Sequence, residues 1–157
     1  MLLPLNPFST DPDRGAIWEM LVARDIAAFV AADWTMVAGD FIEAGFGGLH
    51  AHKSRNPDDW TLAFPSLATY RDEWLRQAAE SAQTKYAEDL SAGIHRATRL
   101  QQIDITGDAA VAHKKFDGLI SLANGSKDRL NWQTLYMCRR EAGRWKIAGF
   151  VGYLAHL

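Results

Sequence analysis

Three titratable side chains are the candidates for acid–base chemistry: Asp25, His95 and His113. General acid–base catalysis uses a carboxylate or an imidazole whose pKa lies near the working pH, and burial or a charged partner can move it there. Asp25 is a candidate because it lies among apolar residues on one side of a predicted helix. An ion pair of Asp25 with Arg14 or with a neighbouring strand is an equally open interpretation. His95 and His113 each fall in a predicted strand, where alternation leaves open which of them faces the helices.

The other reactive side chains form no recognisable motif. His50 and His52 would point to the same side of an extended segment and could begin a metal site, but two ligands do not complete one. Cys138 is the single cysteine, and its strand favours a small buried side chain over a nucleophile. Serine hydrolases carry a Gly-x-Ser-x-Gly elbow, which the sequence lacks. We therefore predict no bound metal and no cofactor.

Aromatic residues are abundant, with six Trp, seven Phe and four Tyr. Rings on a sheet and on a facing helix could line a pocket for a flat hydrophobic ligand, with Tyr or His fixing its polar end. Ordinary core packing is the alternative, and it accounts for some of these rings. The rings predicted to line the pocket are Trp74, Phe116, Trp132, Tyr136 and Phe150.

The first half of the chain is predicted to be mainly helical. Asp11 can cap a helix over residues 14–32. Ser66 can cap a second helix that runs to about Lys85. Residues 53–65, between these helices, are predicted to form a polar loop.

The C-terminal third alternates apolar runs with residue combinations that turn antiparallel hairpins. The predicted strands span residues 94–106, 109–122, 129–140 and 145–154. A break in the alternation between Leu100 and Ile103 predicts a bulge that helps the sheet to curve. Helices followed by a contiguous antiparallel sheet predict an α+β domain in which helices cover one sheet face.

Length and charge narrow the class of protein. A chain of 157 residues suits one domain, here residues 1–157 with residues 1–11 as an N-terminal extension. The net charge of −2 argues against a dedicated nucleic-acid binder. The N-terminus lacks the basic region of a secretory signal, and no apolar run approaches the ~20 residues that span a bilayer. We expect a cytoplasmic protein without a membrane or nucleic-acid partner.

Several local patterns occur together in a recognisable order. They are a long helix closing on Ala32-Asp33-Trp34, a short strand at Phe41-Ile42-Glu43, and hairpins at residues 107–111 and 143–149. From Asp13 to Tyr153 this order resembles the nuclear transport factor 2-like superfamily, in particular its SnoaL-like branch. The resemblance implies a cone-shaped, cystatin-like domain in which a curved antiparallel sheet wraps around N-terminal helices and encloses a deep pocket. It also implies a homodimer formed through the sheet.

Members of this superfamily include ketosteroid isomerases, polyketide cyclases and scytalone dehydratase, but their catalytic positions differ here. The isomerase-type carboxylate and a dehydratase tyrosine both fall on Ala44, and the dehydratase Tyr-Asp pair falls on Phe29 and Val30. One dehydratase histidine resembles His95 with a different spacing, and the second falls near Ile120. The resemblance therefore implies a pocket without carrying over a reaction.

Two functions are compatible with the sequence. The preferred one is a pocket protein that binds a small hydrophobic or hydroxylated aromatic or polycyclic molecule. As an enzyme it would be a cofactor-independent isomerase, cyclase or dehydratase, with Asp25 and His95 or His113 transferring the proton. The alternative is a non-catalytic ligand-binding or dimeric interaction domain, which the changed residues at Ala44, Phe29 and Val30 favour.

Overall fold

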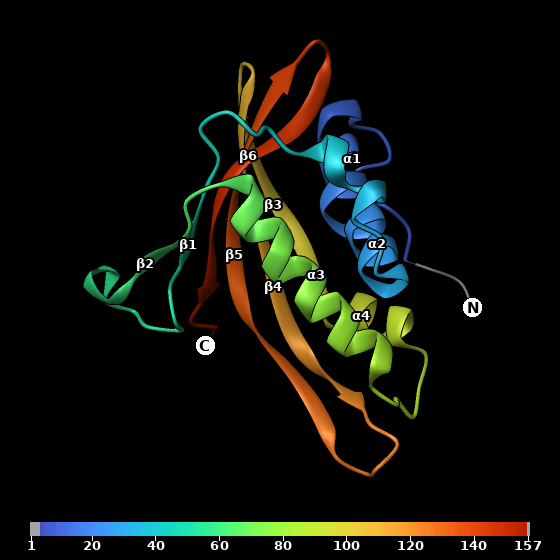
Figure 1. Cartoon of the computed structure of the whole chain (residues 1–157). Coiled ribbons are helices and arrows are strands. Elements are labelled where there is room, and N and C mark those ends of the chain that lie inside the picture. Colours follow the sequence, from blue (N-terminus) through green and yellow to red (C-terminus); the bar gives the residue numbers. More distant parts are fainter. Residues whose placement is uncertain (1–3, 157) are drawn as a thin grey trace.

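The computed structural model describes residues 4–156, in which helices cover one face of a curved six-stranded sheet (Figure 1). The helical elements are α1 (Pro12–Trp18), the π-helix η1 (Glu19–Arg24), α2 (Asp25–Ala31), η2 (Trp34–Met36), η3 (Ala38–Asp40), η4 (Pro57–Asp59), α3 (Leu67–Gln83) and α4 (Leu90–Ala97). The strands are β1 (Gly47–His50), β2 (Thr61–Phe64), β3 (Thr98–Thr106), β4 (Ala109–Ser121), β5 (Lys127–Glu141) and β6 (Arg144–Leu154).

The predicted first helix is confirmed as one continuous helical segment, α1–η1–α2. The Asp11 side chain caps its start by accepting from the Arg14 backbone N–H, and Ala32 ends it with a φ of 52°. Its middle turn is π-helical, a rare geometry found mostly as single-turn bulges and often at functional sites. Of the predicted extension, residues 1–3 lie outside the described part. Asn6 packs back on the helix, where its amide donates to the Gly15 carbonyl.

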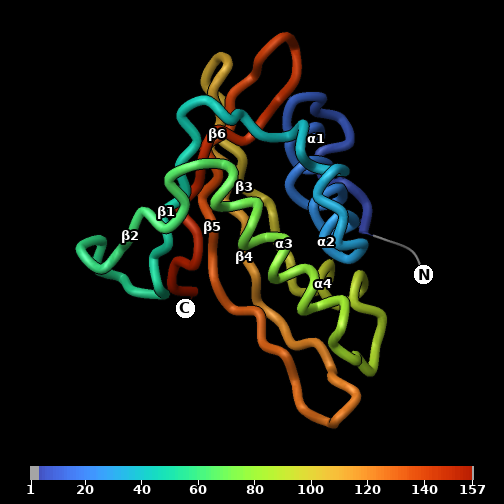
Figure 2. The backbone as a smooth tube through the Cα atoms, viewed as in Figure 1, coloured from blue at the N-terminus to red at the C-terminus, as the bar shows by residue number. Residues whose placement is uncertain are grey.

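The predicted four-stranded meander is confirmed as β3 to β6, and the sheet order is β2-β1-β6-β5-β4-β3. Figure 2 shows the β3–β4 and β5–β6 turns at one end of the sheet and the β4–β5 turn at the other. The predicted bulge is confirmed by a register shift between Leu100 and Gln102. Two further shifts occur between β5 and β6, and such irregularities bend and twist a sheet.

Three predicted elements differ from the structure. The predicted strand at 94–106 begins only at Thr98, because Asp89 caps the helix α4 in front of it. The predicted polar loop at 53–65 contains β2, which pairs with β1. The predicted strand near Phe41 is reduced to a single bridge with Ile147. In addition, β1 runs parallel to β6, so the sheet is mixed at this edge.

The core lies between the helices and the inward face of the sheet. At Gly118 of β4 an added Cβ would lie 2.7 Å from the Cβ of Ala97, so α4 packs directly on the sheet. Asp40 and Lys114 are buried there despite their charges. Among residues 4–156 no helix has both the length and the hydrophobicity that crossing a bilayer requires.

Candidate functional site

A cavity of about 160 Å³ lies between the helices and the curved sheet. Its apolar wall consists of Ile26, Phe29, Phe64, Trp74, Ile94, Phe116, Leu130, Trp132 and Phe150. Its polar lining comes from Asp25, Tyr70, Glu73, Gln77, Thr134, Tyr136 and Tyr153. All five rings predicted from the sequence to line a pocket do line this cavity, and their role in binding stays a prediction.

Asp25 reaches the cavity from the first turn of α2 and is paired with a buried lysine. The Lys114 Nζ of β4 lies 3.1 Å from Asp25 Oδ2 and also donates to the backbone carbonyl of Leu21. Lys114 is only 1% exposed. Leu21 lies in the π-helical turn, so this turn supplies one of the two acceptors for the ammonium. Asp25 therefore lines the cavity and also forms an ion pair with a neighbouring strand, which is one of the two ion pairs that the sequence left open.

The Lys114 ammonium is surrounded by aromatic rings as well as by oxygen atoms. Its Nζ lies 5.0 Å from the centroid of Phe116 and 6.0 Å from that of Tyr136. Cation–π attraction of this kind helps to compensate an ammonium for the loss of water. Lys114 therefore places a positive charge behind Asp25 without itself lining the cavity.

Two tyrosines face the same part of the cavity as Asp25. Burial raises the pKa of both Tyr70 and Tyr136 well above the usual value, and the negative charge of Asp25 raises each pKa further. Both phenols therefore stay protonated at neutral pH and can donate a hydrogen bond. Within residues 4–156 neither hydroxyl is engaged by another side chain, whereas those of Tyr86 and Tyr153 are.

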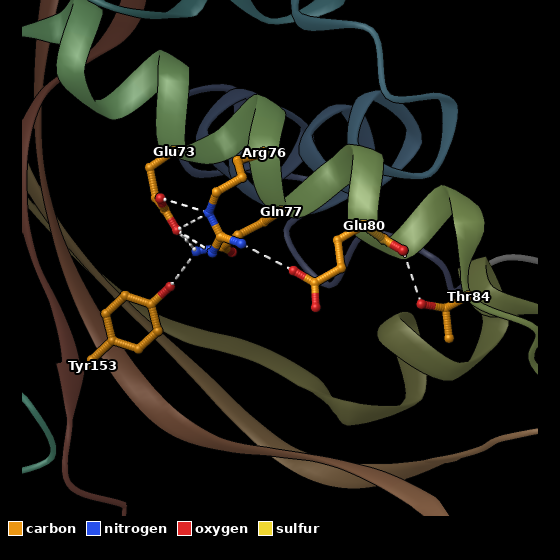
Figure 3. Close-up of polar contacts among 6 residues, drawn as sticks. All are labelled: Glu73, Arg76, Gln77, Glu80, Thr84 and Tyr153. Carbon is orange, nitrogen blue, oxygen red and sulfur yellow. Dashed lines mark hydrogen bonds and ion pairs between the residues drawn. The ribbon is translucent and has the colours of Figure 1, made fainter.

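A partly exposed polar cluster between α3 and β6 forms part of the rim of the cavity (Figure 3). The Gln77 amide donates to Glu73 Oε1 at 3.1 Å and to the Tyr153 hydroxyl at 3.0 Å. Arg76 also pairs with Glu73 and lowers the pKa of that carboxyl. The Tyr153 ring stacks on His50 with centroids 4.2 Å apart. These contacts hold Tyr153, whose φ is 55°, in one position at the rim.

His50 and His52 stack on each other with their ring centroids 4.2 Å apart. His52 lies beyond the end of β1 with a φ of 54°, and its Nε2 bonds Thr61 Oγ1 at 2.9 Å. Among the described residues no three His, Cys, Asp or Glu side chains are grouped to hold a metal ion. Cys138 is buried, and burial raises the pKa of its thiol to about 12. The buried interpretation of Cys138 therefore fits the structure.

The two candidate histidines lie outside the cavity. His113 is on the outer face of β4, where its Nε2 bonds Gln133 Oε1 at 2.6 Å, because its neighbours Ala112 and Lys114 point inward. His95 is buried in α4 rather than in a strand, and it is absent from the cavity lining. The structure thus brings Asp25 to the cavity and brings neither histidine to it.

His95 predicts a pH dependence of stability. Burial lowers the pKa of His95, and the charge of Lys114 lowers it further. In the unfolded chain the His95 imidazole takes up a proton near its ordinary pKa of about 6.5, whereas in the folded protein it stays neutral down to a lower pH. We expect the free energy of unfolding to fall as the pH drops below about 6.5. Urea denaturation at pH 7 and pH 5 measures this fall.

The matched variants for this measurement are His95→Asn and His113→Asn. The former should reduce the decrease in stability between pH 7 and pH 5, because it removes the buried imidazole. His113→Asn alters a histidine on the outer face of the sheet and should leave the decrease in stability between pH 7 and pH 5 unchanged. An equal decrease in wild type and His95→Asn would contradict the prediction.

Sequence reasoning missed Lys114 and Tyr70 as site residues, although signals for both were present. Lys114 lies two residues before Phe116 in β4, so alternation points it inward with that ring. Tyr70 lies one helical turn before Trp74 in α3 and shares its face.

No protein-family model matches the chain, and no curated protein matches it. Several solved structures do match the chain. A protein of unknown function from Shewanella baltica, described as NTF2-like, is 15% identical, with coverage of 90% of this chain and 92% of that chain and a TM-score of 0.55. A nuclear transport factor 2-like superfamily protein from Salmonella enterica is 14% identical, with coverage of 92% of each chain and a TM-score of 0.57.

A third similar structure is a candidate aromatic ring hydroxylase from Novosphingobium aromaticivorans. It is 16% identical, with coverage of 93% of this chain and 91% of that chain and a TM-score of 0.58. At such low identities these likenesses bear on the fold. Together with the helix-covered curved sheet, they show the nuclear transport factor 2-like fold and confirm the predicted α+β class.

Proposed function

Given this nuclear transport factor 2-like fold, we propose that the protein binds a small ring compound in its cavity and transfers a proton with Asp25. The observation that carries the proposal is the meeting of the Asp25 carboxylate with two protonated phenols in a cavity whose lining is mostly apolar. An apolar cavity with a few convergent polar groups is the usual form of a small-molecule site. No cofactor takes part in the proposed reaction.

The size of the cavity narrows the ligand class. Its volume of about 160 Å³ is close to that of an engineered apolar cavity of about 150 Å³ that binds benzene. A single ring therefore fits, and a polycyclic molecule would have to extend past Gln77 and Tyr153 at the rim. Among the similar structures, the candidate aromatic ring hydroxylase is named for a ring-shaped substrate, which agrees with this class.

The residues suit a proton shift in a cyclic ketone. The Asp25 carboxylate takes a proton from the carbon beside the carbonyl group, and the electrons of that C–H bond move onto the carbonyl oxygen as an enolate forms. Tyr70 and Tyr136 donate hydrogen bonds to this oxygen, where charge develops. Asp25 then returns the proton to a different carbon of the enolate. The carbon–carbon double bond has moved, and no redox step has occurred.

The test uses cyclohex-3-en-1-one as a one-ring probe in deuterated water, followed by proton NMR. We expect protein-dependent deuterium exchange beside the carbonyl and conversion to the conjugated ketone. Phenol, a one-ring mimic of the enolate, should bind and inhibit, which calorimetry and the NMR assay measure. Phenol binding with neither deuterium exchange nor conversion to the conjugated ketone would refute catalysis and leave the non-catalytic binding function. Absence of both binding and exchange would refute the cavity as a site for one-ring ligands.

The homodimer expected from the resemblance is also a proposal, with the outer sheet face as its interface. Val111 of β4 and Met137 of β5 are directly paired on this face and are 42% and 37% exposed. Exposed apolar side chains on a sheet face favour association with a complementary surface. A second copy presents the same strip, so the contact can be isologous.

The double variant Val111→Asp, Met137→Asp should shift the protein toward monomer in sedimentation velocity, because it places like charges in the proposed interface. Leu62→Asp is the control, since Leu62 is 58% exposed on β2 and outside the strip. A wild type that sediments as a monomer at all concentrations would contradict this interface.

A further inference from the structure

A second, much smaller cavity lies on the far side of Asp25. Its volume is about 10 Å³, close to the minimum of roughly 10–15 Å³ that a cavity needs to hold one water molecule. Asp25, Tyr70 and Tyr136 line both cavities, so they form the partition between them. The remaining wall includes Asp40 and apolar side chains such as Val37 and Ile147.

Asp40 brings an ordered carboxylate to the small cavity. It is 1% exposed and accepts from Arg24 Nε at 2.7 Å, from Arg24 Nη2 at 2.9 Å and from Arg144 Nη2 at 2.6 Å. A carboxylate offers about four acceptor positions. Three are used by these guanidinium groups, so one position on Oδ2 is left for a further donor.

Asp25 also lines the small cavity and has acceptor capacity of its own. Its Oδ2 accepts from Lys114, which leaves most of its acceptor positions open. The hydroxyls of Tyr70 and Tyr136 each add a donor and an acceptor. A buried water typically makes about three hydrogen bonds to such groups, and these four side chains provide enough partners.

From this arrangement we propose that one water molecule is bound in the small cavity, between the carboxylates of Asp25 and Asp40 and beside the two tyrosines. Its role rests on the proposed function: when a ligand fills the large cavity, this water exchanges protons with Asp25 from behind. In deuterated water this molecule takes the abstracted proton from Asp25 and gives Asp25 a deuteron in exchange, and Asp25 then transfers the deuteron to the ligand. The product then carries solvent deuterium rather than the proton that was removed.

The first test is a high-resolution crystal structure of the wild type and of two matched variants. Val37→Ile adds one methylene to the wall of the small cavity and should displace the water. Val22→Ile adds the same group at a buried position that lines neither cavity and should keep it. A density peak within hydrogen-bond distance of Asp25 and Asp40 in the wild type and in Val22→Ile, absent from Val37→Ile, supports the proposal. A wild type without this peak overturns it.

The second test follows deuterium in the product of cyclohex-3-en-1-one. Val37→Ile should incorporate several-fold less deuterium per conversion than the wild type, with phenol affinity unchanged, and Val22→Ile should match the wild type. Equal incorporation in all three proteins overturns the relay role. A wild type that does not convert the ketone refutes the proposed function instead, and the diffraction test still decides whether the water site exists.

Discussion

Asp25→Asn should slow deuterium exchange of cyclohex-3-en-1-one by about 10²–10⁴-fold, the usual contribution of a general base. The asparagine keeps the size of the side chain but cannot take up a proton at neutral pH. Its amide oxygen can still accept from the Lys114 ammonium, which lies 3.1 Å from Asp25 Oδ2 in the wild type. Phenol should therefore bind with nearly unchanged affinity, and calorimetry beside the NMR exchange assay separates binding from proton transfer.

Asp72→Asn is the matched control for this experiment. Asp72 is an exposed aspartate of α3 that does not line the cavity, so its variant should exchange deuterium at the wild-type rate. Thermal unfolding of both variants checks that the fold is intact. A variant Asp25→Asn that exchanges as fast as the wild type would remove Asp25 from the reaction, even if the cavity binds phenol.

The order of the elements could be predicted because its signals are local. Asp11 and Ser66 cap helices in the structure as their side chains predict, and Ser66 forms a capping box with Thr69. The turn glycines at 107, 125 and 143 all have positive φ, a conformation that L-residues avoid. The secondary structure of residues 90–97 is less certain from the sequence, because a short apolar run suits either a strand or a buried helix. In the structure these residues form the helix α4, and the Asp89 side chain caps its start.

The composition of the cavity wall could be predicted better than its chemistry. Period-two alternation on β5 places Trp132 and Tyr136 on one face, and the structure finds both in the cavity wall. Pairing between distant residues has no such local signal. Lys114 and Asp25 are 89 residues apart and meet only because the fold brings the start of α2 close to β4. The π-helical turn, whose Leu21 carbonyl accepts from Lys114, likewise has no recognisable sequence pattern.

The Asp25–Lys114 pair should also be the most sensitive point for stability near the site. Lys114→Met keeps the length of the side chain but removes the ammonium, which leaves the Asp25 carboxylate and the Leu21 carbonyl without their donor. Removing one partner of a buried ion pair costs about 3–5 kcal/mol. Asp25 is 32% exposed, so solvent screens part of its charge and we expect about 3 kcal/mol, the lower end of that range. Urea denaturation measures this loss.

The adjacent lysine provides the control, because strand alternation gives the two side chains opposite environments. Lys115 points to the outer face of β4, and Lys115→Met should change the free energy of unfolding by no more than about 0.5 kcal/mol, as usual for surface substitutions. The double variant Asp25→Asn, Lys114→Met completes a thermodynamic cycle. The double variant has no unpaired carboxylate. Its free energy of unfolding should therefore fall by less than the sum of the decreases in the two single variants. Additive losses would show that Lys114 stabilises the fold through the Leu21 carbonyl and the rings of Phe116 and Tyr136, independently of the charge on Asp25.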